Sequence, residues 1–311
     1  MHESVLLNET IEGLSLESNS ESKIILVDGT LGRGGHSIEA FRKQSDIFVI
    51  GIDRDEDALT ESRKKFEALG KKEHIDFELF LGNFSDMDKF VKPILQTTFQ
   101  KEGKTSVDAI ILDLGLSSPQ IDSSGRGISF KNDEPLLMTM EKEVKEGSFT
   151  AQDIVNGWKE EDIANVIYAY GDERYARRIA RGIVEVRETD PIKTTSQLVQ
   201  VIEKSVPYMY RKGKIHPATR TFQALRIAVN DELGSLKKGL LVAESMLKPK
   251  GRLAIISFHS LEDRIAKTMI KEWQTKDLGM QSTKKPIEPG SEEVKRNPRS
   301  RSAKLRIFIK N

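Results

Sequence analysis

The sequence contains no cysteine. This absence excludes disulfides, zinc–thiolate sites and cysteine-ligated iron–sulfur clusters, together with every mechanism that uses a cysteine nucleophile. Histidine is also scarce, at five residues, and no two of these have a metal-ligand spacing such as H-E-x-x-H. We therefore expect no metal. His259 stands where a strand pattern gives way to a helix pattern, so a local structural hydrogen bond is expected of it.

Long apolar runs and an excess of either charge are also lacking. No run approaches the roughly 18 residues that span a bilayer, and residues 1–4 lack the basic start of a signal peptide. We expect a cytoplasmic protein without a membrane partner. Lys and Arg number 49 against 48 Asp and Glu, so any nucleic-acid surface must come from local segregation of charge. The sequence leaves the oligomeric state open, a homodimer included.

What is present is enough apolar sequence for a real core, since hydrophobic residues make up 37% of 311. Short β-branched runs alternate with helical stretches in the first third, which predicts a parallel sheet covered by helices. The predicted strands are Lys23–Val27, Ile47–Ile52, Ile75–Leu81, Val107–Leu112, Arg252–Phe258 and Lys304–Ile309.

Between the fourth and fifth predicted strands the pattern changes to consecutive helices. We therefore predict an α/β fold in which a doubly wound, Rossmann-like sheet formed by residues 1–122 and 218–311 is interrupted by an all-helical insertion domain at residues 123–217. Residues 276–302 are polar and rich in Pro, Gly, Lys and Arg, which predicts a loop that could serve as a mobile basic arm.

A glycine-rich stretch, Asp28–His36, follows the first predicted strand and opens a helix, where α/β sheets bind nucleotides. A dinucleotide motif would need glycine where Ser37 stands, and a P-loop would need Gly-Lys-Ser/Thr after Gly34. Asp53, at the end of the second strand, is placed to accept hydrogen bonds from ribose hydroxyls. An adenosine ligand without a pyrophosphate fits, and S-adenosylmethionine is the commonest. A glycine-rich turn with helix-capping acids is the alternative.

Two further strand ends carry polar or aromatic groups. Phe84 could pack against an adenine face or simply belong to the core. Asp113–Gln120 occupies the position of a catalytic loop, in which Asp113 or a backbone carbonyl could accept an N–H of an exocyclic amine. Ser117 and Ser118 could equally be helix caps. Without cysteine, methylation at carbon 5 of cytosine is excluded, whereas methylation of an amine or a hydroxyl stays open.

Together these stretches resemble the ribosomal small-subunit methyltransferase H family (RsmH, also called MraW), whose members methylate N4 of a cytidine in small-subunit rRNA. The resemblance runs nearly end to end and includes Val5–Glu9, Asp28–Ser37, Asp53–Asp55, Asp113–Gln120, Arg126–Phe130, His216–Arg226, Ser257–Arg264 and Asn297–Arg299. It implies that the helical insertion helps to hold rRNA. It also implies that S-adenosylmethionine contacts Gly34, Gly35, His36, Asp53, Phe84, Asp113 and Gln120.

One segment departs from the family pattern. Where the family usually reads Pro-Leu-Asp-Met-Arg-Met, this chain carries Leu137 and Thr139 in place of the acid and the arginine. Either those charges are dispensable, or neighbours such as Asp133 and Glu141 substitute, or activity is reduced.

Basic residues gather in the helical part. Arg174, Arg177, Arg178 and Arg181 form a stripe on the helix predicted at Glu173–Arg187, which either contacts phosphates or is a solvated face balanced by nearby acids. A second stretch interleaves aromatics with cations in a Gly-containing loop, a composition typical of base stacking. The RNA-contacting residues we predict are Tyr208, Tyr210, Arg211, Lys212, Lys214 and Arg220.

The leading hypothesis is S-adenosylmethionine-dependent methylation of the exocyclic N4 amine of a cytidine in small-subunit (16S-type) rRNA. Its partner would be that rRNA or the assembling small ribosomal subunit. The alternative is a catalytically impaired rRNA-assembly factor that still binds the cofactor. A small-molecule methyltransferase is less favoured, because the insertion and the aromatic basic loop would then have no task.

Overall fold

A computed structural model describes residues 4–16, 23–44, 46–73, 76–115, 125–141 and 147–311. The chain divides into two compact units. The sheet unit comprises Met1–Gly115 and Leu233–Asn311, and the helical unit comprises Leu116–Glu232. Each is described on its own.

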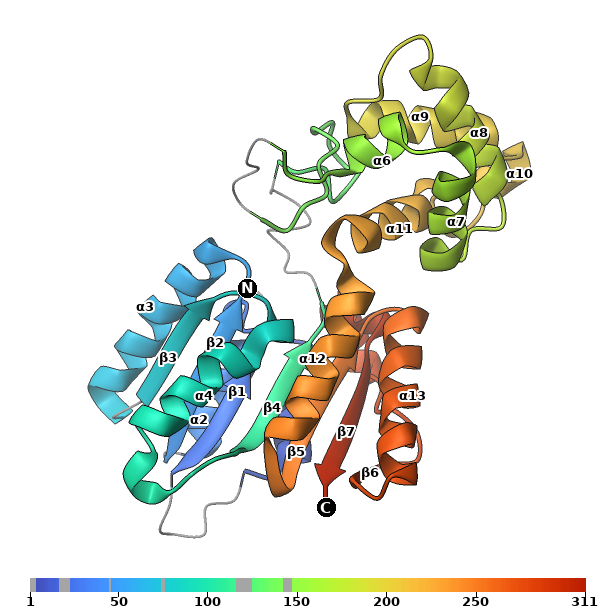
Figure 1. The fold of residues 1–311 in the computed structure, drawn as a ribbon. Coiled ribbons are helices and arrows are strands. Elements are labelled where there is room, and N and C mark those ends of the chain that lie inside the picture. Colours follow the sequence, from blue (N-terminus) through green and yellow to red (C-terminus); the bar gives the residue numbers. More distant parts are fainter. Residues whose placement is uncertain (1–3, 17–22, 45, 74–75, 116–124, 142–146) are drawn as a thin grey trace. The chain divides into compact units, whose positions relative to one another are not determined.

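The sheet unit is built on a sheet with the strand order β3-β2-β1-β4-β5-β7-β6 (Figure 1). The first five strands in this order are mutually parallel, whereas β7 lies antiparallel between β5 and β6. The predicted α/β sheet is confirmed, and the strand predicted at Lys304–Ile309 is β7, whose antiparallel direction was not predicted. The strands are β1 (Ile24–Asp28), β2 (Ile47–Asp53), β3 (Asp76–Leu81), β4 (Val107–Asp113), β5 (Leu247–Ser257), β6 (Gly279–Gln281) and β7 (Lys304–Lys310).

Helices cover both faces of this sheet, and the strand residues alternate between two cores. Along β4, Ile110 and Leu112 join one core, whereas Ala109 and Ile111 join the other. Each fully buried Leu or Ile contributes about 1.5–3 kcal/mol relative to an exposed one. The first core packs against α4 (Met87–Thr97), α12 (Glu232–Met246) and α13 (Ser260–Thr275), and the second against α1 (Leu7–Leu14), α2 (Gly35–Lys43) and α3 (Glu56–Glu73).

The helical unit has its own apolar core. Its described helices are α6 (Ala151–Gly157), α7 (Glu160–Gly171), α8 (Ala176–Arg187), α9 (Thr195–Ser205), α10 (Tyr208–Arg211) and α11 (Ala218–Asn230). This unit extends past the insertion limit predicted at residue 217, because α11 buries Ala218, Phe222 and Leu225 in the helical core. None of the described helices has the length and apolar character needed to cross a membrane.

The prediction of a loop at residues 276–302 is wrong. This segment contains β6, the short helix α14 (Ser291–Arg296) and the 3-10 helix η3 (Pro298–Ser302). Tertiary pairing provides the order that local composition does not, since β6 pairs with β7 and Ile287 forms a bridge with Leu305.

Candidate functional site

The glycine-rich stretch forms the turn between β1 and α2 at the carboxyl edge of the sheet. Gly32 and Gly34 have positive φ angles of 51° and 73°, a conformation that favours glycine. A Cβ atom on Gly34 would lie 3.0 Å from Phe66, so the position is crowded as well. Gly34 precedes α2 without a side-chain cap, and the first N–H groups of a helix find no acceptor within it. The turn therefore allows a ligand to approach backbone N–H groups closely.

Asp53 ties this turn to the end of β2. Its Oδ2 accepts the N–H of Gly32 at 2.6 Å, and its Oδ1 accepts the N–H of Asp55 at 2.8 Å. Burial raises the pKa of Asp53, while these backbone hydrogen bonds act in the opposite direction. A carboxylate offers about four acceptor positions, so Asp53 keeps acceptor capacity for ligand hydroxyls.

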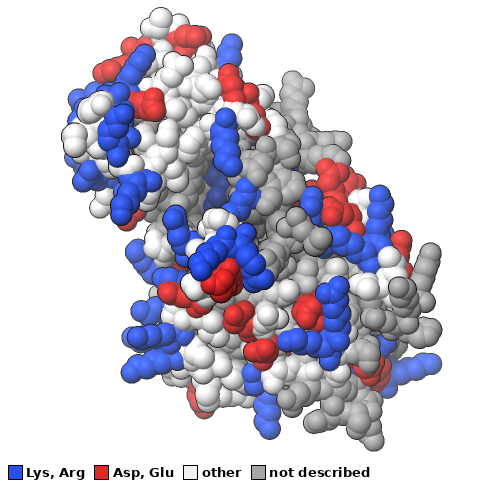
Figure 2. Space-filling model, turned by 180° about the vertical axis from the view of Figure 1, so that it is seen from behind, with Lys and Arg blue, Asp and Glu red and all other residues white. Residues whose placement is uncertain are grey.

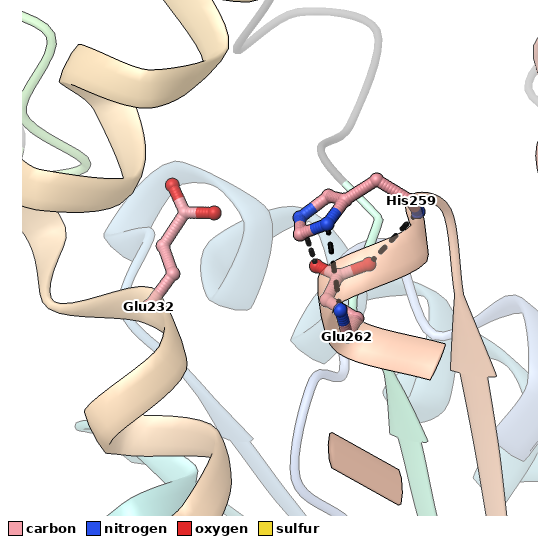
Figure 3. A group of neighbouring side chains, drawn as sticks. All are labelled: Glu232, His259 and Glu262. Carbon is pink, nitrogen blue, oxygen red and sulfur yellow. Dashed lines mark hydrogen bonds and ion pairs between the residues drawn. The ribbon is translucent and has the colours of Figure 1, made fainter. Parts of the chain in front are cut away.

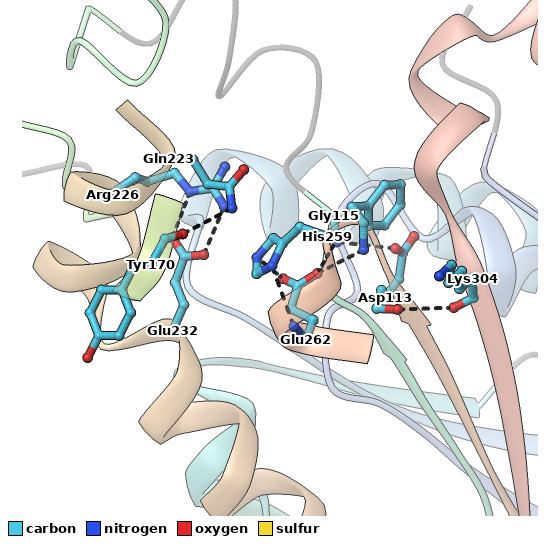
Figure 4. Close-up of polar contacts among 11 residues, drawn as sticks. Asp113, Gly115, Tyr170, Gln223, Arg226, Glu232, His259, Glu262 and Lys304 are labelled. Carbon is cyan, nitrogen blue, oxygen red and sulfur yellow. Dashed lines mark hydrogen bonds and ion pairs between the residues drawn. The ribbon is translucent and has the colours of Figure 1, made fainter. Parts of the chain in front are cut away.

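Asp113 ends β4, next to β1. Its N–H donates to Thr30 Oγ1 at 2.6 Å, and its Oδ1 accepts the N–H of Gly115 at 3.3 Å (Figure 4). Burial raises the pKa of Asp113 to about 7; the Gly115 hydrogen bond opposes this rise, and the negative charge of Glu262 adds to it. The carboxyl group is thus fixed at the edge and titrates near neutrality.

His36 and Asp28 extend this edge into a group of titratable side chains. His36 Nε2 donates to the carbonyl of Val5 at 3.0 Å, and its Nδ1 lies 3.9 Å from Asp113 Oδ2. Asp28 accepts from Ser37 Oγ at 2.6 Å. Burial raises the pKa of Asp28 to about 6 and lowers that of His36. Asp28 was absent from the predicted site, although it opens the glycine-rich stretch.

The other predicted cofactor contacts are Phe84, Gly35 and Gln120. Phe84 begins the 3-10 helix η1 (Phe84–Asp86), and its ring packs where a Cβ on Gly239 of α12 would lie 2.4 Å away. The ring therefore packs against the core, and its role with adenine stays a prediction. Gly35 opens α2, where a Cβ would collide with Ser4 Oγ. Gln120 lies outside the described residues, as does most of the predicted catalytic loop.

His259 and Glu262 link β5 to α13. His259 is the N-cap of α13, and its Nδ1 accepts the N–H of Glu262, whose carboxylate accepts the N–H groups of Phe258 and His259 (Figure 3). The local hydrogen bond predicted for His259 is confirmed. Glu262 was not among the predicted site residues.

In the helical unit, the predicted aromatic and basic loop is mostly the single turn α10. Tyr208 is 61% exposed, and the cations of Arg211 and Lys212 each lie 5.5 Å from its ring centre. Tyr210 differs, because its hydroxyl donates to the buried Glu173 at 2.5 Å. Burial and that carboxylate raise the pKa of Tyr210 to about 12. Tyr208 is thus available to a partner, whereas Tyr210 anchors the turn.

Two arginines of the predicted stripe contact other side chains of the helical unit. Arg174 precedes α8 and lies 4.9 Å from the ring centres of both Tyr175 and Tyr210, while Arg181 pairs with Glu160 at 3.7 Å. Glu173, an acid next to the stripe in sequence, is buried. In Figure 2, Lys and Arg side chains gather on one side of the helical unit at the upper left, with acidic side chains above them.

The segment that departs from the family pattern is ordered through its backbone. The Asn230 side chain donates to the carbonyl of Met138 at 2.8 Å and accepts the N–H of Met140 at 2.8 Å. Within the segment, the Thr139 hydroxyl also accepts the N–H of Glu141 at 3.2 Å. Asp133, one suggested substitute for the missing acid, accepts the N–H of Ser196 at Oδ1, at 3.2 Å. Near the end of α11, Arg226 forms a bidentate ion pair with Glu232 (Figure 4).

This chain is similar to known methyltransferases over nearly its whole length. A relative from Crocosphaera subtropica is 45% identical over 99% of this chain and 88% of its own length, and one from Carboxydothermus hydrogenoformans is 42% identical over 99% and 97%. Both are named ribosomal RNA small subunit methyltransferase H. An rRNA methylase structure from Streptococcus thermophilus aligns at 12% identity, with a TM-score of 0.43, over 100% of this chain and 98% of that one. The family model described as MraW methylase matches residues 1–311, and the chain belongs to that family.

Proposed function

We propose that this chain transfers a methyl group from S-adenosylmethionine to RNA of the small ribosomal subunit, in the cytoplasm and while the subunit assembles. The observation that carries the proposal is the family match over residues 1–311, together with a 45% identical relative that is named a ribosomal RNA small subunit methyltransferase. The residues at the edge of the sheet support the proposed binding of S-adenosylmethionine. The surface of the helical unit supports the proposed binding of RNA.

The residues at the sheet edge fit S-adenosylmethionine, which supplies a methyl group on a positively charged sulfur when bound. Gly34 and Gly35 would let the ligand approach the first turn of α2. Asp53 would accept its ribose hydroxyls with the acceptor capacity left after two backbone hydrogen bonds. Asp113, together with Asp28, would face the positive charge, because opposite charge stabilises a carboxylate at short range. Phe84, His36 and Gln120 remain proposed contacts.

We further propose that the acceptor is the exocyclic N4 amine of a cytidine. Methylation at carbon 5 would require a cysteine, and the chain has none. An exocyclic amine is a weak nucleophile, since its lone pair is delocalised into the ring. An acceptor for one of its N–H groups would orient it and increase its electron density. Asp113 is our candidate acceptor, because it ends a central strand, its backbone N–H is bound by the Thr30 hydroxyl and its carboxyl accepts the N–H of Gly115.

The helical unit, with the predicted insertion at residues 123–217 as its main part, would hold the RNA. Tyr208 offers an exposed ring on which a base can stack, and Arg211, Lys212 and Lys214 are exposed cations that can contact phosphates. Tyr210 and Arg220 would act indirectly, because the first binds Glu173 and the second donates to the carbonyl of Asp172 at 3.2 Å.

Incubation with labelled cofactor and small ribosomal subunits at successive assembly states tests this proposal. We expect label in the RNA, and nucleoside mass spectrometry should give N4-methylated cytidine. Label on another atom would contradict the amine assignment while leaving the methyl transfer intact. Cofactor binding without transfer at any assembly state would contradict methyl transfer and favour the impaired assembly factor.

A further inference from the structure

One peptide group near the start of the chain joins two parts of the sheet unit that are far apart in sequence. The carbonyl of Val5 accepts a hydrogen bond from His36 Nε2 at 3.0 Å, and the N–H of Leu6 donates to Glu293 Oε1 at 2.9 Å. The peptide bond is trans, so its C=O and N–H point in opposite directions. The peptide group therefore bridges α2 and α14.

This peptide group is held firmly. Leu6 is fully buried and Val5 is 7% exposed, in the core shared with α1 and α2. Leu6 has a φ angle of 51°, a left-handed conformation that is strained for a residue other than glycine. Burial of the Leu6 side chain and the bond to Glu293 offset that strain. The direction of the Val5 carbonyl therefore depends on the contact made by Leu6.

The bridge sets which nitrogen of His36 carries hydrogen. A carbonyl oxygen can only accept, so Nε2 must be the protonated nitrogen, and in a neutral ring Nδ1 is then a bare acceptor. Burial lowers the pKa of His36, which favours the neutral ring. The bare Nδ1 lies 3.9 Å from Asp113 Oδ2. The charged groups around His36 are Asp28 from β1, Asp113 from β4 and Glu293 from α14.

We propose that Glu293 is a positioning residue for the cofactor edge: by holding the N–H of Leu6, it keeps the Val5 carbonyl on His36 and the imidazole Nδ1 directed at Asp113. The importance of that arrangement rests on the proposed function, whereas the arrangement itself can be measured without RNA. Glu293 thereby gives a helix near the end of the chain an influence on the turn between β1 and α2.

Glu293 and its neighbour allow a matched set of variants. Glu293→Met keeps the length of the side chain and removes the acceptor oxygen, whereas Glu293→Gln keeps an oxygen at the same place. Glu292→Met is the control, since Glu292 is on the same helix with a side chain 78% exposed. The readouts are the ring-nitrogen NMR spectrum of His36, assigned by its loss in His36→Gln, and calorimetric affinity for S-adenosylmethionine. Thermal unfolding verifies that each variant is folded.

In the unchanged protein we expect the nitrogen pattern of the Nε2–H tautomer. Glu293→Met should give a mixture of tautomers and a several-fold loss of cofactor affinity, while Glu293→Gln and Glu292→Met should match the unchanged protein. An unaltered His36 pattern in folded Glu293→Met would overturn the proposal, and so would a Gln variant that behaves like Met. If Glu293→Met does not fold, Glu293→Ser replaces it. A protein that transfers no methyl group would contradict the proposed function and leave the NMR result standing.

Discussion

The two units hold their polar side chains in opposite ways. In the sheet unit, the carboxyl groups of Asp53 and Asp113 are largely buried, receive backbone hydrogen bonds and have raised pKa values. In the helical unit, Arg211 and Lys212 are exposed and lie over the exposed ring of Tyr208. Fixed groups suit one small ligand and a defined reaction geometry, whereas solvated cations suit a flexible polyanion. The comparison predicts which property each substitution changes.

The largest effect should come from Asp113→Ala, which removes a fixed group of the sheet unit. If its carboxylate accepts the amine N–H, methyl transfer should slow by roughly two to three powers of ten, as for loss of one preorganised electrostatic group. Single-turnover measurement at saturating cofactor isolates the chemical step. Arg181→Ala, in the helical unit, is the control. If the single-turnover rate stays near normal, Asp113 does not accept the amine N–H, and a backbone carbonyl of the loop after β4 becomes the candidate acceptor.

Asp53→Ala should weaken the binding of S-adenosylmethionine by on the order of 1–3 kcal/mol, because ribose hydroxyls would lose an acceptor. Calorimetry measures this loss, and circular dichroism shows whether the fold is kept. Glu67→Ala, an exposed acid on α3, is the matched control. A folded variant with unchanged affinity for S-adenosylmethionine would show that Asp53 does not bind the ribose hydroxyls.

Cofactor affinity should depend on pH, with a direction fixed by Asp113. Its pKa is raised to about 7 without ligand, and a bound cation favours the charged carboxylate. Binding should therefore release protons and tighten as the pH rises through about 7, levelling off above it. Calorimetry in buffers of different ionisation enthalpy detects the released protons. Asp113→Asn should abolish most of this dependence; if the dependence persists, it belongs to Asp28 or another group.

Neutralising Arg211, Lys212 and Lys214 together should lower the affinity for RNA and leave the affinity for the cofactor unchanged, the opposite of what we expect for Asp53→Ala. Each lost phosphate contact should flatten the log–log salt dependence of RNA binding by roughly one unit. Filter binding over a salt series measures the slope, with Lys89 and Lys92 of the sheet unit neutralised as the control. An unchanged slope would make this turn ordinary solvated surface.

The last prediction concerns two neighbouring tyrosines, whose substitution should change different properties. Tyr208→Ala should weaken RNA binding by about 1–3 kcal/mol if a base stacks on the ring. Tyr210→Phe should lower the free energy of unfolding by about 1 kcal/mol through the lost bond to Glu173, with little change in RNA affinity. Equal losses of RNA affinity in the two variants would show that anchoring and binding are not divided in this way.

Strand and loop order could be predicted from the sequence because the central strands are apolar on both faces. The ends of β1, β2 and β4 could thus be placed at one edge of the sheet, which puts Gly34, Asp53 and Asp113 in one predicted site. β6 was not predictable, since three residues carry no pattern and its order comes from pairing with β7.

The site residues that sequence reasoning missed act through distant partners. Glu293 contacts Leu6 across 287 positions of the chain, and Asn230 contacts Met138 across 92. No local spacing signals such a pair. Asp28 and Glu262 could have been suspected, because each stands beside a motif that was recognised, but acids in such places are commonly caps and turns.

The position of β7 bears on the order in which the protein can be made. β7 lies between β5 and β6, yet both neighbours are synthesised before it. Until Lys304–Lys310 emerges, β5 remains an edge strand with an open row of backbone donors and acceptors, and such edges template association with other chains. A chain that lacks Lys304–Lys310 would therefore expose β5 as an aggregation-prone edge of the sheet.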